Sequence, residues 1–152
     1  MLVPVPFILT ALVYGASYVV LTHYPLGRYI YAMGGNEEAA RLSGVPINRV
    51  KIMVYALCGA LAGFAGVVAI SRLAAADPTS GVMMELDAIA AVVIGGASLM
   101  GGRGHIFGTI VGVAIIAVLH NVMTLLDINP DWQGMVLGAV ILAAVLANKR
   151  RA

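Results

Sequence analysis

Four long stretches almost free of charged side chains limit what this chain can fold into. Residues 1–22, 52–71 and 132–148 contain no Asp, Glu, Lys, Arg or His, and residues 106–126 contain only His120. A helix needs about 20 mostly apolar residues to cross the hydrocarbon core of a bilayer. Charged residues make up 11% of the chain, whereas soluble domains carry roughly 25%. The sequence therefore predicts an all-α, polytopic membrane protein.

About five membrane-spanning helices are expected, over residues 3–22, 50–71, 86–101, 106–126 and 132–148. The first apolar run lacks the basic start and the cleavage site of a signal peptide, so it is interpreted as a true span. The third is short, because its roughly 15 residues reach only about 22 Å. A re-entrant hairpin also fits that length.

The distribution of Lys and Arg predicts the orientation, because cytoplasmic loops retain an excess of them. If all five helices span, one side carries Arg28, Arg41, Arg49, Lys51, Arg103, Lys149, Arg150 and Arg151, and the other side carries only Arg72. The amino terminus is then outside and the carboxy terminus cytoplasmic. A re-entrant third helix would remove this asymmetry, so a full span is favoured.

Several functional classes find no support in the sequence. The basic residues are scattered and form no stripe with interleaved aromatics, so no nucleic-acid partner is expected. Cys58 is the only cysteine, and it cannot form an internal disulfide or a cysteine metal cluster. The glycine-rich run at 95–105 lacks the GK[ST] ending of a phosphate loop and is expected to be a tight turn. No catalytic, cofactor-binding or metal-binding residue is predicted.

Small residues recur four apart within the expected spans. Two such pairs are Gly59 with Gly63 and Gly108 with Gly112. In lipid, these pairs let helix backbones approach closely. They are expected at helix packing contacts or at a subunit interface.

Polar residues inside the spans are candidates for function, because burying them in lipid is costly. His120 and Asn121 are the clearest ones, and they either line a polar translocation path or bond across helices. The acidic residues all fall in expected loops or at helix ends, and Asp87 is placed in the first turn of the third helix. This argues against a small proton-driven secondary transporter, which needs a buried carboxylate.

The connection over residues 23–49 is predicted to hold a short cytoplasmic helix at about 37–43. Gly34-Gly35 breaks the chain, and Asn36 is a suitable amino-terminal cap. Glu37 and Glu38 suit the first turn, and Gly44 followed by Pro46 ends the helix. A plain interhelix loop would also account for such a helix.

Two long ordered motifs resemble a known family. The strings GRYIYAMGGNEEAARLSGVPINRVKI at 27–52 and ELDAIAAVVIGGASLMGGRGHIFGTIVG at 85–112 are similar to ribose-type sugar permeases of the branched-chain amino acid and sugar ABC importer family. The similarity extends from about Pro4 to Arg150. Such permeases are roughly twice as long, so the resemblance implies that residues 1–152 are the carboxy-terminal half of the permease domain. Ala97 stands where the sugar type usually has Thr.

The resemblance also implies a function and partners. The expected role is that of a partial permease subunit in an ATP-driven importer of ribose or a related monosaccharide, in the bacterial inner membrane. The chain itself is then not an enzyme. The implied partners are a cytoplasmic ABC ATPase, a periplasmic sugar-binding protein, a second permease copy and membrane lipid. The segment that resembles the ATPase-coupling helix comprises Gly34, Gly35, Asn36, Glu37, Glu38, Ala39, Ala40, Arg41, Leu42, Ser43 and Gly44.

Within that segment, Ala39, Ala40 and Ser43 are small enough for close docking, and Arg41 offers a charged contact.

The alternatives to a permease are a non-transporting membrane scaffold or remnant, and a small secondary transporter.

Overall fold

The computed structural model describes residues 5–73 and 81–149, whose regular structure is entirely helical. The all-α, polytopic class is therefore confirmed. Within the described residues, three helices are long and apolar enough to cross a membrane: α1 (Val5–His23), α4 (Ile47–Leu73) and α6 (Ile106–Leu125). Some positions used in the predictions above, namely 3, 4, 150 and 151, lie outside the described residues. The chain divides into two compact units, residues 1–80 and 81–152.

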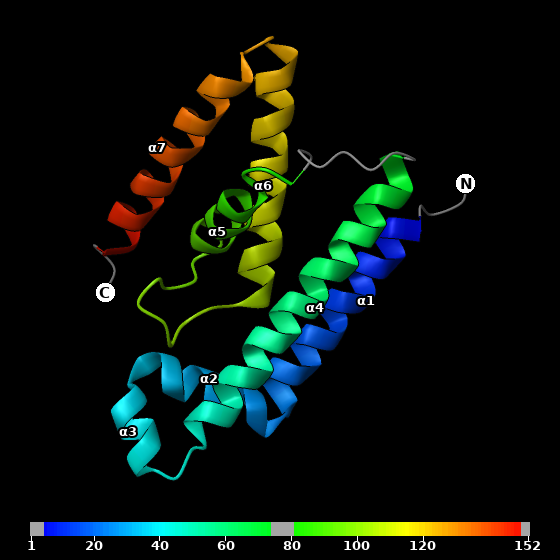
Figure 1. Ribbon diagram of the computed structural model, residues 1–152. Coiled ribbons are helices and arrows are strands. Elements are labelled where there is room, and N and C mark those ends of the chain that lie inside the picture. The colour runs from blue at the N-terminus through cyan, green and yellow to red at the C-terminus, as the bar shows by residue number, and fades with distance from the viewer. Residues whose placement is uncertain (1–4, 74–80, 150–152) are drawn as a thin grey trace. The chain divides into compact units, whose positions relative to one another are not determined.

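The first unit is built on two long helices with a helical connection at one end. In Figure 1, α1 and α4 run side by side, and an apolar groove is lined by residues of both. Two helices join them, α2 (Pro25–Gly35) and α3 (Glu37–Leu42). Helix α3 matches the short helix expected at 37–43. Helix α2 was not predicted.

Helix α2 begins directly after α1 because of two residues. Pro25 occupies the first helical position, where its fixed φ is favourable and its missing N–H costs nothing. Gly27 is buried, and a Cβ at this position would collide with the backbone carbonyl of Leu21. The chain can therefore turn sharply from α1 into α2 only with glycine here.

The second unit consists of α5 (Met84–Ile94), α6 and α7 (Pro130–Lys149). Helix α5 packs against both of the longer helices, as Figure 1 shows. The buried centre of this packing is formed by Ala90 and Ala91 of α5, Ile116 of α6 and Leu137 of α7. In α7 the apolar part is shorter than the helix, at Trp132–Leu146.

The helix expected at 86–101 is wrong in length, because α5 ends at Ile94. Gly96 adopts a φ of 87°, and the amides of Gly96 and Ala97 bond back to the carbonyls of Val93 and Val92. This is the Schellman arrangement that stops helices. The 11 residues of α5 rise only about 16 Å, roughly half of the hydrocarbon core.

Although α5 is short, it runs antiparallel to α6 along much of that helix. Asp87, near the start of α5, contacts His120, which lies five residues before the end of α6. Gly95, just after α5, packs against Gly108, near the start of α6. The chain from Asp87 to Gly95 therefore runs from the carboxyl end of α6 toward its amino end. This is the direction expected if the segment crosses the membrane.

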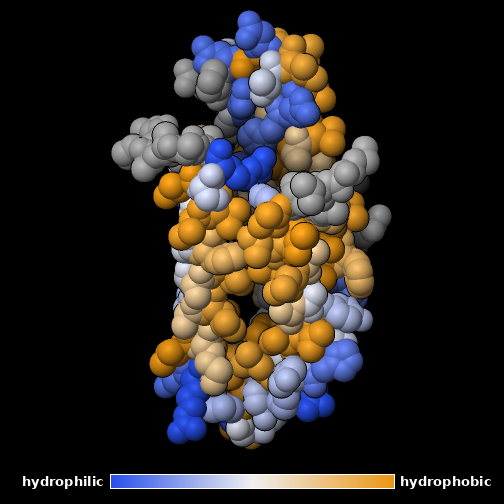
Figure 2. All heavy atoms as spheres, turned by 90° about the vertical axis from the view of Figure 1, so that its right-hand side faces the viewer, coloured by the Kyte–Doolittle hydropathy of each residue, from blue (hydrophilic) through white to orange (hydrophobic). Residues whose placement is uncertain are grey.

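Most large apolar side chains of the described residues are exposed rather than buried. Helix α1 has no buried residue, and Phe7, Leu12 and Tyr55 are each at least 66% exposed. Figure 2 shows a face that is mainly hydrophobic over its middle, with hydrophilic side chains gathered at its lower end, where α2 and α3 lie in Figure 1. Lipid, or protein outside this chain, must cover such a surface.

Candidate functional site

Helix α3 has a well-formed amino-terminal cap. The side-chain oxygen of Asn36 accepts a hydrogen bond of 3.0 Å from the amide of Ala39. Glu37 and Glu38 lie in the first turn, where the helix dipole favours negative charge. The predicted cap is thus confirmed. Gly34 and Gly35, expected to break the chain, form the last turn of α2.

The carboxyl end of α3 is also defined by local contacts. Gly44 has a φ of 83° and donates its amide to the carbonyl of Arg41, while the amide of Val45 reaches the carbonyl of Ala40. The hydroxyl of Ser43 donates to the carbonyl of Ala39 over 2.8 Å. Helix α3 therefore has satisfied ends on both sides, although it is only six residues long.

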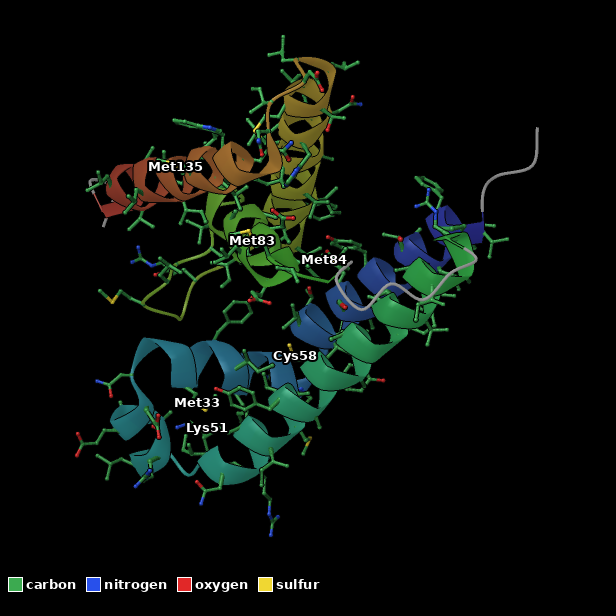
Figure 3. All side chains as sticks on the ribbon, turned by 45° about the horizontal axis from the view of Figure 1, so that its top comes forward. Met33, Lys51, Cys58, Met83, Met84 and Met135 are labelled. Atoms are coloured by element: carbon green, nitrogen blue, oxygen red, sulfur yellow. The ribbon has the colours of Figure 1, made fainter. Side chains whose placement is uncertain are left out.

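An ion pair connects α3 to α4. The Nζ atom of Lys51 donates to Oε2 of Glu37 over 2.7 Å, and the guanidinium of Arg41 lies 3.6 Å from Oε1 of the same carboxylate. Figure 3 shows Lys51 in the space between α3 and α4. The hydrogen bond from Lys51 is the main cause that lowers the pKa of Glu37 below its ordinary value. The pair thus connects the short helix to the second turn of α4.

Burial separates the residues of α3 into an inner and an outer face. Ala40 is 5% exposed, and Val50 in the first turns of α4 is 1% exposed. Ala40 is therefore covered by its own chain, which corrects the expectation that it docks a partner. Leu42, at 85% exposure, and the exposed Arg41 are instead available. Arg41 also lines an open groove with Val45, Pro46, Ile47, Asn48 and Arg49.

The glycines singled out in the sequence fall into two groups. A Cβ on Gly108 would collide with the carbonyl of Gly95, and one on Gly112 with the carbonyl of Ala91. These two glycines thus let the α5 and α6 backbones touch. A Cβ on Gly59 or Gly63 of α4 would meet no atom within 4 Å in the described structure, apart from nearby backbone of the same helix.

His120 forms a polar contact that the sequence reasoning missed. Its Nε2 atom lies 3.0 Å from Oδ1 of Asp87, and the two side chains are 38% and 32% exposed. Of the two interpretations left open for His120, the structure shows a bond across helices. Asn121, the next residue, is exposed. The antiparallel α5–α6 contact brings the pair together, and only a prediction of that helix register could have found it.

Comparison with known proteins gives consistent matches. The model of the family described as "Branched-chain amino acid transport system / permease component" matches residues 2–145. A ribose import permease protein of Escherichia coli is 50% identical over 149 residues, and one of Haemophilus influenzae is 49% identical over 146 residues. A xylose transport system permease protein of Escherichia coli is 46% identical over 152 residues.

These alignments cover almost all of this chain but only part of each relative. They include 98%, 96% and 98% of the chain, and 46%, 45% and 39% of the respective relatives. The chain thus spans less than half the length of the curated relatives it matches. No solved structure matches the chain.

The family match extends over nearly the whole chain. It covers residues 2–145 and so includes both structural units. The chain therefore belongs to the family of permease components of branched-chain amino acid transport systems.

Proposed function

We propose that this chain forms part of the permease subunit of an ATP-driven ABC importer for ribose or a related monosaccharide. The observation that carries the proposal is the 49–50% identity to ribose import permeases over nearly the whole chain. Residues 1–152 would supply the carboxy-terminal half of the permease domain. The rest of the path and of the subunit interface would come from permease sequence outside these residues.

Helix α3 is the proposed coupling element, within the segment Gly34 to Gly44. Its caps and the Glu37–Lys51 ion pair hold it rigidly against α4. A rigid short helix transmits a push to the helix it is attached to, whereas a flexible loop would absorb it. The exposed Leu42 and Arg41 give it an apolar and a cationic contact for an ATPase subunit.

The partners follow from this role. ATP hydrolysis takes place on a separate cytoplasmic subunit, a periplasmic binding protein delivers the sugar, and a second permease copy completes the path. A Cβ on Gly59 or Gly63 would meet open space in the described structure, so these two glycines are proposed to contact another helix of the complex. In the inner membrane, α3 faces the cytoplasm and the carboxy terminus is cytoplasmic.

The proposed mechanism is alternating access. Closure of the ATPase dimer shifts α3, and because α3 is pinned to α4, the spans move with it. His120 and Asn121 are proposed to lie on the path. The differential binding of ATP to the closed ATPase supplies the free energy for the change.

A chimera tests the proposal directly. In it, this chain replaces the matching 149 residues of the Escherichia coli ribose permease, expressed with the ATPase and binding protein of that system in cells lacking their own permease. We expect ATP-dependent uptake of radiolabelled ribose. A second chimera is built in the same way from the xylose permease and expressed with the partners of the xylose system. Comparison of its xylose uptake with the ribose uptake of the first chimera decides between the two sugars.

The same experiment addresses the alternatives. A chimera that assembles in the membrane but imports neither sugar would support a non-transporting scaffold or remnant. Sugar uptake that persists when the ATPase is omitted would support a secondary transporter.

A further inference from the structure

The contact between Asp87 and His120 places an acid and a base among apolar helices. Asp87 lies in the first turn of α5, and His120 lies five residues before the end of α6, about 7.5 Å inside it. Ala90 and Ile116, one helical turn away from them in sequence on α5 and α6, belong to the apolar packing centre of the unit. Such an acid–base pair is costly at membrane depth, so its position needs a physical reason.

The exposed part of this pair cannot face hydrocarbon. The two side chains keep 38% and 32% of their surface uncovered, and ionisable groups within membrane segments face protein or water-filled space. Thr124, one turn beyond His120, is exposed and lies on the same side of α6. His120 and Thr124 therefore form a polar strip along this side of α6, and Asp87 of α5 is bonded to His120.

The hydrogen bond also determines which polar atoms of the two side chains remain for other contacts. It occupies Oδ1 of Asp87 and Nε2 of His120, which leaves Oδ2 of Asp87 and Nδ1 of His120 as further polar atoms. A carboxylate oxygen accepts hydrogen bonds, and an imidazole nitrogen donates or accepts according to its tautomer. Sugar hydroxyl groups do both. The pair thus offers a fixed acceptor next to an adaptable partner.

We propose that Asp87 and His120 contact the monosaccharide during transport, with Asp87 as the residue that accepts hydrogen bonds from its hydroxyl groups. This inference rests on the proposed function. It adds Asp87 to the path and assigns it a role in recognising a polyhydroxylated substrate. The pairing with His120 positions the carboxylate.

Uptake per ATP hydrolysed in the ribose chimera tests this role. Asp87→Asn keeps the shape of the side chain but removes the negative charge. We expect the ATPase stimulation by ribose-loaded binding protein to remain, while ribose uptake per ATP falls about tenfold, as expected when a charge-assisted hydrogen bond is lost. Unchanged uptake per ATP would contradict the proposal.

The exchange variant Asp87→His with His120→Asp separates recognition from simple helix packing. It rebuilds an acid–base pair between α5 and α6, so assembly in the membrane should recover. If the carboxylate contacts sugar, uptake per ATP stays low because the acceptor has moved to the other helix. Recovery of both assembly and uptake would show that the pair only holds the helices together.

A thiol-labelling measurement leaves the pair intact and serves if these variants fail to assemble. In a Cys58→Ser background, Thr124→Cys should react with a small hydrophilic thiol reagent, and ribose should slow the reaction. Val118→Cys is the matched control, since Val118 is 63% exposed and two residues from His120, on the other side of α6. Equal, slow labelling of both positions would contradict the polar strip, whether or not the chimera imports ribose.

Discussion

At the scale of single residues, Glu37 contacts two charged side chains, those of Lys51 and Arg41. It accepts from Lys51 over 2.7 Å and lies 3.6 Å from Arg41. Both neighbours are partly exposed, and exposed ion pairs contribute little to stability. The value of the contact is therefore geometric, because it fixes the direction of α3 relative to α4.

The first prediction concerns the titration of Glu37. Because Lys51 lowers its pKa in the folded chain, the stabilisation is present above the ordinary glutamate pKa and is lost as the pH falls through the lowered value. Carbon-13 NMR of labelled Glu37 in micelles should show a midpoint below the ordinary glutamate value. Lys51→Met should raise the midpoint more than Arg41→Gln does. A midpoint of Glu37 at the ordinary glutamate value would show that the ion pair is absent.

The second prediction concerns Leu42, which is 85% exposed on α3. If the ATPase packs against it, Leu42→Ser should lower the ATPase stimulation in the ribose chimera about tenfold, since burying a leucine contributes roughly 1.5–3 kcal/mol. Leu42→Met is the matched control, because it keeps an apolar side chain of similar volume at the same position. Equal stimulation in both variants would place the docking contact elsewhere.

At the scale of helices, close backbone packing determines the α5–α6 hairpin. Gly108 and Gly112 touch the backbone of the segment from Ala91 to Gly95. Without the hydrophobic effect to drive association inside lipid, such close contact is a main source of helix affinity. The short length of α5 makes each of these contacts more important.

The third prediction follows from this packing. Gly108→Ala and Gly112→Ala should each destabilise the chain, by about 1–3 kcal/mol, because the added methyl group forces the backbones apart. Gly138→Ala is the control, since the added Cβ would meet no atom of the described structure within 4 Å beyond its own helix's backbone, and alanine favours a helix. Thermal unfolding in detergent should show a lower Tm only for the first two. A lower Tm for Gly138→Ala alone would mean that α7 carries the tight contact.

A structural feature could be predicted from the sequence when the residues that cause it are neighbours in the chain. The cap at Asn36 and the stop at Gly44 involve neighbouring residues, and both were predicted. Helix α2 was missed because a polar, glycine-containing connection masked the helix-starting role of Pro25. The pair of Asp87 and His120 was missed because it joins residues 33 positions apart, through a helix register that no short pattern encodes.

At the scale of the whole molecule, orientation follows from the spans and from the basic residues. Helix α4 begins beside the cationic side chains Arg41, Arg49 and Lys51. Helix α5 then runs antiparallel to α6, from the level of His120 toward that of Gly108. In the orientation proposed above, based on the positive-inside rule, both α3 and the loop after α5 are cytoplasmic.

The fourth prediction tests this orientation by cysteine labelling in a Cys58→Ser background. Asn129, between α6 and α7, should react with a membrane-impermeant thiol reagent added to spheroplasts once it is replaced by cysteine. Ser43→Cys and Met100→Cys should react only after the membrane is permeabilised. Met100 is 94% exposed, so burial by its own chain would not explain a slow reaction there. External labelling of Met100→Cys together with protection of Ser43→Cys would show that the segment from α5 to the loop returns to the outside. The third apolar segment would then be re-entrant, and α6 and α7 would have the opposite orientation to the one proposed.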